Sequence, residues 1–135
     1  MSLDPVELVR ANSAAFSALD VETMLTMYAP EAVVCDHRSP ALLGEFAGHD
    51  QLRAFYEGIT GAAAEMHERL DVIAAEGEVV VADCELRGRL KADPSGHEVA
   101  APYGMLVTVH DGLITRLELH DDGSAALEAS GLQPG

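Results

Sequence analysis

The stretch "ALDVETMLTMYAPEAVVCD", residues 18–36, changes from a helical to a strand-like hydrophobic pattern within a short length. Asp20 can cap a short helix, and Pro30 is the kind of residue that ends one. One face of this predicted helix is apolar and is formed by Met24, Leu25 and Tyr28. The apolar run that follows predicts a strand over residues 32–37, which ends on ionisable side chains.

A longer helix is predicted before this stretch. Asp4 can cap it, Pro5 suits its first position, and Glu7 completes a capping-box pattern. Two largely apolar stripes follow, which are Val6, Val9, Ser13 and Phe16, and then Leu8, Asn12, Ala15 and Leu19. We therefore expect this helix to be covered on more than one side.

The chain after the quoted stretch predicts a short strand within residues 42–48 and a helix over residues 49–61. From Met66 onward the hydrophobic period becomes two, which predicts strands. We expect two hairpins, built from residues 66–76, 79–91, 99–111 and 113–120, and a final short helix over residues 122–131. Helices segregated from an antiparallel sheet indicate a single α+β domain, residues 1–135.

The composition narrows the class of protein. The chain has 135 residues, of which 48% are hydrophobic and 23% charged, as in globular proteins. Its net charge of -15 argues against nucleic acid and against an anionic membrane surface, because both need clustered Lys and Arg. Cys35 and Cys84 lie in apolar runs and are expected to be buried free thiols. With neither a signal segment nor a spanning run, we expect a soluble cytoplasmic protein.

Four pieces of sequence, taken together and in order, resemble one superfamily. They are "LD…M…YAPEAVV.D", the helix start "G.D.L..FY", "DGLITRLELHD", and the closing "ALEASGL". The chain resembles the nuclear transport factor two-like superfamily, and within it the ketosteroid isomerases and SnoaL-like polyketide cyclases. The resemblance covers nearly the whole chain. It implies a cone-shaped α+β barrel, in which a strongly curved antiparallel sheet wraps around the long N-terminal helix and encloses an apolar pocket.

Strand alternation agrees with such a pocket. From Val80 to Leu90 the even-numbered side chains are apolar, and Leu117, Leu119 and Asp121 share the face that the resemblance turns inward. We expect a small apolar ligand to contact Asn12, Tyr28, Phe55, His67, Cys84, Leu86, Tyr103, Met105, Leu117 and Leu119.

Asp36 lies where the resemblance places the proton-abstracting aspartate of a ketosteroid isomerase. Its carboxylate, partly desolvated at the mouth of an apolar cone, could carry a proton between two carbons next to a carbonyl. His37 could orient it or shuttle its proton, and Asp121 could act as a second acid. The structural alternatives are that Asp36 caps a turn or pairs with Arg38, and that Asp121 caps the last helix.

Two function classes stay open. The first is an isomerase or cyclase without a cofactor or a metal, acting on a small apolar carbonyl compound. The second is a non-catalytic ligand-binding or dimerisation module, because the family's oxyanion-binding side chains are replaced by Asn12 and by Gly104 or Tyr103. Relatives pair through the outer face of the sheet, so the resemblance also implies a homodimer.

Overall fold

The structure is a computed structural model that describes residues 3–38 and 44–134. Four helices and six strands follow one another along these residues. The chain order is α1 (Pro5–Ser17), α2 (Val21–Leu25), β1 (Tyr28–Asp36), β2 (Glu45–Ala47), α3 (Gly48–Ala62), β3 (Ala63–Glu76), β4 (Val79–Leu90), β5 (Glu98–His110), β6 (Leu113–His120) and α4 (Gly123–Ser130).

The predicted helix starts are confirmed by their capping contacts. Asp4 accepts a hydrogen bond from the Glu7 backbone, and the Glu7 side chain accepts one from the Asp4 backbone, so the capping box is complete. Asp20 caps α2 by accepting from the Thr23 backbone, and Asp122 caps α4. Local sequence therefore fixes where these three helices begin.

The end of α2 differs from the prediction. The helix stops at Leu25, and Tyr28 already pairs with Ile114 as the first residue of β1. Pro30 lies inside this strand, in a section where the register with β6 shifts before Val33. A strand tolerates proline at such an irregularity, because no ladder hydrogen bond is lost there.

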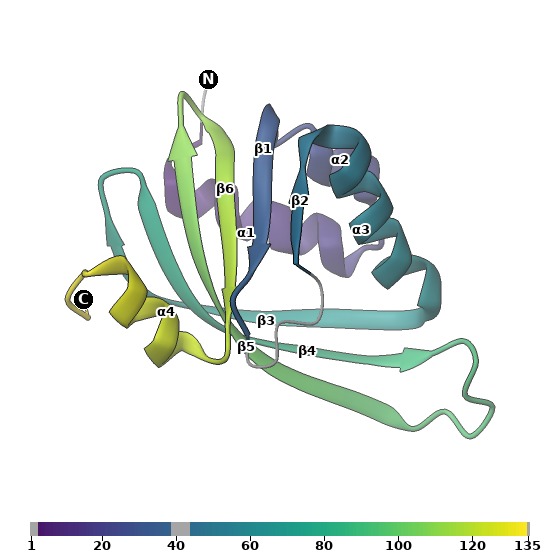
Figure 1. Ribbon diagram of the computed structural model, residues 1–135. Helices are drawn as coiled ribbons and strands as arrows, with labels where there is room; N and C mark the ends of the chain where they lie inside the picture. The colour runs from purple at the N-terminus through teal and green to yellow at the C-terminus, as the bar shows by residue number, and fades with distance from the viewer. Residues whose placement is uncertain (1–2, 39–43, 135) are drawn as a thin grey trace.

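The six strands form one sheet in the order β2-β1-β6-β5-β4-β3. The two predicted hairpins pair as expected, but β1 runs parallel to β6 rather than antiparallel. β2 and β3 lie at the two edges and do not pair with each other, so the sheet does not close into the expected barrel. The sheet is nevertheless strongly curved (Figure 1). β3 also starts at Ala63, directly after α3, and not at Met66.

The helices cover both faces of the sheet unequally. α1, α2 and α3 pack into the curve of the sheet, where Leu8, Phe16, Met24, Leu52 and the inward side chains of the strands form the main core. α4 lies on the other face, where Ala126 contacts a small cluster around Val81 and Leu106. β4 and β5 extend past β6 as a protruding hairpin, and β3 stays paired with β4 along this extension (Figure 1).

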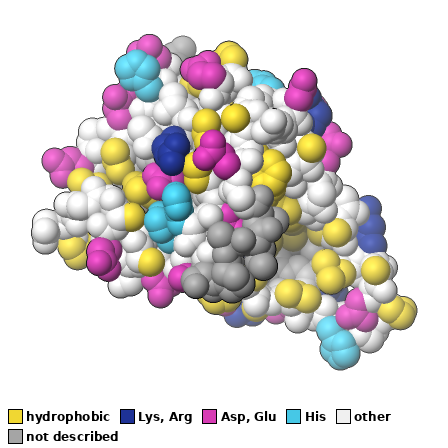
Figure 2. Space-filling model, viewed as in Figure 1, with side chains coloured by type: hydrophobic (Ala, Val, Ile, Leu, Met, Phe, Trp, Pro, Cys, Tyr) yellow, Lys and Arg dark blue, Asp and Glu magenta, His cyan; other side chains and the backbone are white. Residues whose placement is uncertain are grey.

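The surface carries many acidic and few basic side chains, as the net charge requires (Figure 2). Apolar side chains also gather in a hollow between the body of the molecule and the protruding hairpin. Within residues 3–38 and 44–134, no helix is long and apolar enough to cross a bilayer.

Candidate functional site

A cavity of about 90 Å³ lies inside the curve of the sheet. Its wall is mostly apolar and comes from α1, α2, α3 and the strands. The lining side chains are Val9, Asn12, Ser13, Phe16, Met24, Arg38, Phe55, Tyr56, Ile59, Glu68, Leu86, Tyr103, Met105, Val107, Ile114, Leu117 and Leu119. The volume suits a small ligand or a few water molecules.

Among the described residues that line the cavity, Glu68 is the acidic one. It lies on the inner face of β3, and its neighbours at the same parity, Met66, Leu70 and Val72, pack against the main core. Only 7% of Glu68 is exposed. Its backbone N–H donates to the Ser17 hydroxyl at 2.9 Å, which ties β3 to α1 at this point.

Two hydroxyl groups hold the Glu68 carboxyl. Ser13 on α1 donates to Oε1 at 2.6 Å, and Tyr103 on β5 donates to Oε2. Both partners are themselves buried. The carboxyl is thus held from two elements by neutral donors, and no Lys, Arg or His of the described residues forms an ion pair with it.

Burial raises the pKa of Glu68 from 4.5 to about 7, while the Ser13 hydrogen bond acts in the opposite direction. Desolvation dominates because a carboxylate in an apolar cavity loses its hydration and gains no countercharge. Near neutral pH the group exchanges readily between its protonated and ionised forms. This is the condition a general acid or base needs at that pH.

Asp36 lies in a different setting. Its side chain is 1% exposed and forms an ion pair with Arg38, whose Nε donates to Oδ1 at 2.9 Å and whose Nη2 donates to Oδ2 at 3.1 Å. The Arg38 backbone N–H also donates to Oδ1 at 3.0 Å. The cavity wall contains Arg38, whereas Asp36 lies behind it.

Asn12, a predicted ligand contact, lines the cavity and belongs to a polar network that continues behind its wall. Its side-chain amide donates to the Met24 carbonyl at 3.2 Å and accepts from the Tyr28 hydroxyl at 3.5 Å. The Tyr28 and Tyr56 hydroxyls lie 2.6 Å apart. Tyr56 lines the cavity, while Tyr28 is fully buried behind it, so Tyr28 supports the wall.

Six of the other predicted ligand contacts line the cavity, namely Phe55, Leu86, Tyr103, Met105, Leu117 and Leu119. Cys84 is fully buried in the adjoining core, where burial raises the pKa of its thiol. His67 is exposed and, outside the cavity wall, lines an open groove between α1 and β3 to which Glu68 also contributes.

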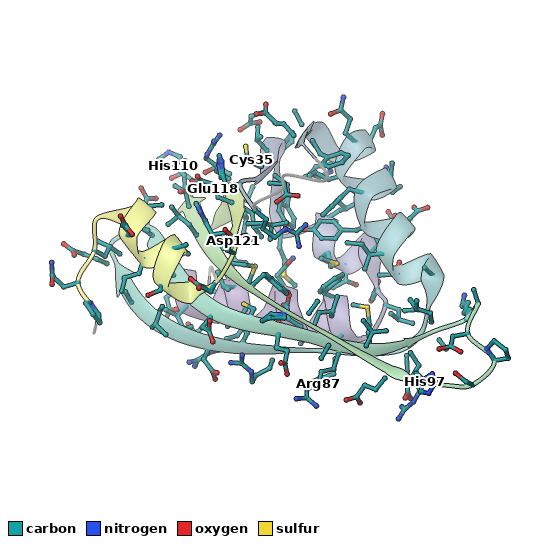
Figure 3. The ribbon with its side chains drawn as sticks, turned by 60° about the horizontal axis from the view of Figure 1, so that its bottom comes forward. Cys35, Arg87, His97, His110, Glu118 and Asp121 are labelled. Atoms are coloured by element: carbon teal, nitrogen blue, oxygen red, sulfur yellow. The ribbon has the colours of Figure 1, made fainter. Side chains whose placement is uncertain are left out.

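His37 and Asp121 lie outside the cavity wall. His37 is 43% exposed, contacts Glu118 at 3.0 Å and stacks on His120. Asp121 is exposed at the end of β6, beside α4 (Figure 3). The structure therefore brings neither side chain together with Glu68.

Sequence reasoning missed Glu68 and Ser13 as a pair. The signal was present, because Glu68 falls on the apolar parity of β3 and Ser13 falls between Val9 and Phe16 in an apolar stripe of α1. A polar residue on an otherwise dry face needs a partner. What the sequence could not show is that these two faces meet.

A family model of the SnoaL-like domain matches residues 9–117 of this chain. No curated protein matches it.

Solved structures share the fold over most of the chain. A protein with a ketosteroid isomerase-like fold from Catenulispora acidiphila, in complex with trimethylamine, is 22% identical with a TM-score of 0.72, covering 94% of both chains. A protein from Jannaschia sp. CCS1, named for its similarity to SnoaL-like polyketide cyclases, is 20% identical with a TM-score of 0.72, covering 96% of this chain and 93% of that one. The epoxide hydrolase/cyclase-like enzyme SalBIII, of pyran ring formation in salinomycin, is 17% identical with a TM-score of 0.73, covering 86% and 88%.

Proposed function

The chain belongs to the SnoaL-like domain family, and from that premise we propose that its cavity binds a small, largely apolar carbonyl compound and moves a proton on it. Glu68 is the group that takes and returns this proton. The reaction class is an isomerisation or a ring closure through an enolate. The observation that carries the proposal is one buried carboxyl, held by two hydroxyls in an apolar cavity.

The burial of Glu68 supports this role. A carboxylate that has lost its hydration is a stronger base than one in water, so it removes a proton from carbon next to a carbonyl more readily. Ser13 and Tyr103 fix the direction of the carboxyl oxygens. A fixed base costs less entropy to bring to the reacting carbon.

The lining supports the ligand class. Apolar side chains from β5 and β6 face Phe16 and Phe55 across the cavity, and the polar groups are few. Such a wall favours an apolar ring or chain with one or two oxygen atoms. Among the similar solved structures, SalBIII is an enzyme of pyran ring formation, and the Jannaschia protein is named after the polyketide cyclases, which supports a ring closure as the reaction class.

The test is proton exchange at carbon. A panel of cyclic ketones and 1,3-diketones is incubated in D₂O with the protein, and loss of the α-proton signal is followed by NMR. We expect accelerated exchange for some members, rising as pH passes about 7. Glu68→Gln should lower the acceleration by about a hundredfold or more.

Glu57→Gln, which changes an exposed glutamate on α3, is the matched control and should exchange like the wild type. Full exchange activity in Glu68→Gln, or no acceleration for any compound, would refute the proposal. A loss in Asp36→Asn with full activity in Glu68→Gln would transfer the role to Asp36.

The alternative function is a non-catalytic binding module. Its supporting observation is that Arg38 occupies both oxygens of Asp36, so the acid at the position of the family base is already paired. In that case the cavity would bind the same apolar compounds without exchange. Thermal-shift screening with the panel above would then show binding, while NMR would show no loss of the α-proton.

We further propose a homodimer that works in the cytoplasm. The support for pairing through the outer face of the sheet is its polar surface, where Arg87 projects away from α1 and α3 and forms ion pairs with Glu85 and Glu98 (Figure 3). Sedimentation at micromolar concentration should give twice the chain mass of 14.3 kDa. A single-chain mass would contradict the dimer.

A further inference from the structure

Among the described residues that line the cavity, Arg38 is the cationic one. Its side chain is 29% exposed, and its place is fixed because Nε and Nη2 both donate to the buried Asp36 carboxylate. A two-point contact of this kind holds the planar group in one orientation.

Only part of the donor capacity of Arg38 is used by that ion pair. A guanidinium has five N–H donors, and Nη1 donates to no atom within residues 3–38 and 44–134. A donor of a cavity-lining side chain that has no acceptor among the described residues is suited to an oxygen atom of the ligand.

The charges of the site favour an oxygen that becomes negative during the reaction. Asp36 and Arg38 together are neutral, so Glu68 sets the net charge of the wall. When the ligand gives its proton to Glu68, one negative charge leaves the carboxyl and appears on the ligand oxygen. The total charge is unchanged, and a positioned guanidinium stabilises the product of that transfer.

We propose that Arg38 is a catalytic residue of this cavity and binds the enolate oxygen, in place of the oxyanion donors that the sequence does not supply. The step is balanced. The α-carbon proton passes to Glu68, the electron pair of the broken C–H bond forms the enolate, and Arg38 Nη1 donates to its oxygen. Return of the same proton to another carbon completes the reaction. This inference rests on the proposed function.

The test uses 4-nitrophenol, a planar phenol whose ionised form absorbs visible light. Its affinity and the ionised fraction of the bound form are measured in the Glu68→Gln variant, which removes the competing carboxylate. We expect bound nitrophenol to be more ionised than free nitrophenol at the same pH. Adding Arg38→Met should reverse this and weaken phenolate binding by about tenfold or more.

Two further variants make the test decisive. Asp36→Asn/Arg38→Met, which leaves no buried charge unbalanced, should show the same loss and guards against misfolding of Arg38→Met. Arg53→Met is the matched control, since Arg53 forms a similar two-point ion pair with Glu22 on the surface. Its phenolate binding should equal that of the parent.

Unchanged ionisation of bound nitrophenol in both variants that lack Arg38 would overturn the inference. This outcome is separable from failure of the proposed function. If exchange at carbon depends on Glu68 but phenolate binding does not depend on Arg38, only the role of Arg38 is refuted. If phenolate binding depends on Arg38 but no exchange at carbon occurs, only the role of Glu68 is refuted.

Discussion

Asp36 and Glu68 are both buried carboxyls near one cavity, but the partner of Asp36 is charged and those of Glu68 are neutral. Asp36 faces a guanidinium, so its charge is balanced by a full opposite charge. Glu68 faces only the hydroxyls of Ser13 and Tyr103. Comparable burial therefore gives different chemistry: the paired acid holds a neighbour in place, whereas the unbalanced acid has the raised pKa that proton transfer requires.

The largest expected effect concerns Glu68 and the pH dependence of stability. Its pKa is raised from 4.5 in the unfolded chain to about 7 in the folded one, so between these values the folded state binds more protons. The free energy of unfolding therefore falls as pH rises through this window, by about 3 kcal/mol from this group.

Urea unfolding of the wild type and of Glu68→Gln from pH 4.5 to pH 8 measures this effect as the difference between the two curves. Glu57→Gln should follow the wild type, because its side chain is exposed. Parallel curves for the wild type and Glu68→Gln would mean that burial does not raise the pKa of Glu68, and would contradict the comparison.

A smaller effect is expected at the paired acid. Arg38→Met leaves the Asp36 carboxylate buried without its countercharge and should lower the free energy of unfolding by about 2 kcal/mol, less than for a fully buried pair because Arg38 is 29% exposed. The double variant Asp36→Asn/Arg38→Met should recover much of this loss. Denaturant unfolding measures both variants, and Arg53→Met is a surface control whose free energy of unfolding should change far less. Equal losses of unfolding free energy in the single and double variants would contradict the claim that Arg38 balances the charge of Asp36.

The smallest expected effect concerns the Ser13 hydroxyl, which donates to Glu68. The Ser13 hydrogen bond lowers the pKa of Glu68, so Ser13→Ala should move the titration midpoint upward by about half to one pH unit. Ser13→Thr keeps the hydroxyl and should titrate close to the wild type. A downward shift in Ser13→Ala would show that the hydroxyl does not favour the ionised form.

Local sequence signals predicted much of the fold. The capping residues Asp4 and Asp20 and the change of period after α3 locate helices and hairpins, since these depend on neighbouring residues. The parallel pairing of β1 with β6 and the strand position of Pro30 depend on contacts distant in sequence. Hydrophobic periodicity within a segment gives no information about contacts between distant segments.

The site was predicted less completely for the same reason. Strand alternation, together with the resemblance, predicts inward positions for Leu86, Leu117 and Leu119, and all three line the cavity. Glu68 and Ser13 meet only because the curved sheet brings β3 against α1, 55 residues away along the chain. The sequence leaves the pairing of Asp36 with Arg38 open as one alternative, but nothing in it indicates that Arg38 itself lines the cavity.

The central claim is that Glu68 carries an exchangeable proton near neutral pH. The most direct measurement is an NMR titration of the Glu68 side-chain carboxyl, labelled with ¹³C and assigned by comparison with Glu68→Gln. A midpoint near pH 7 is the predicted result. A midpoint near 4.5, the ordinary value of a glutamate side chain, would contradict it.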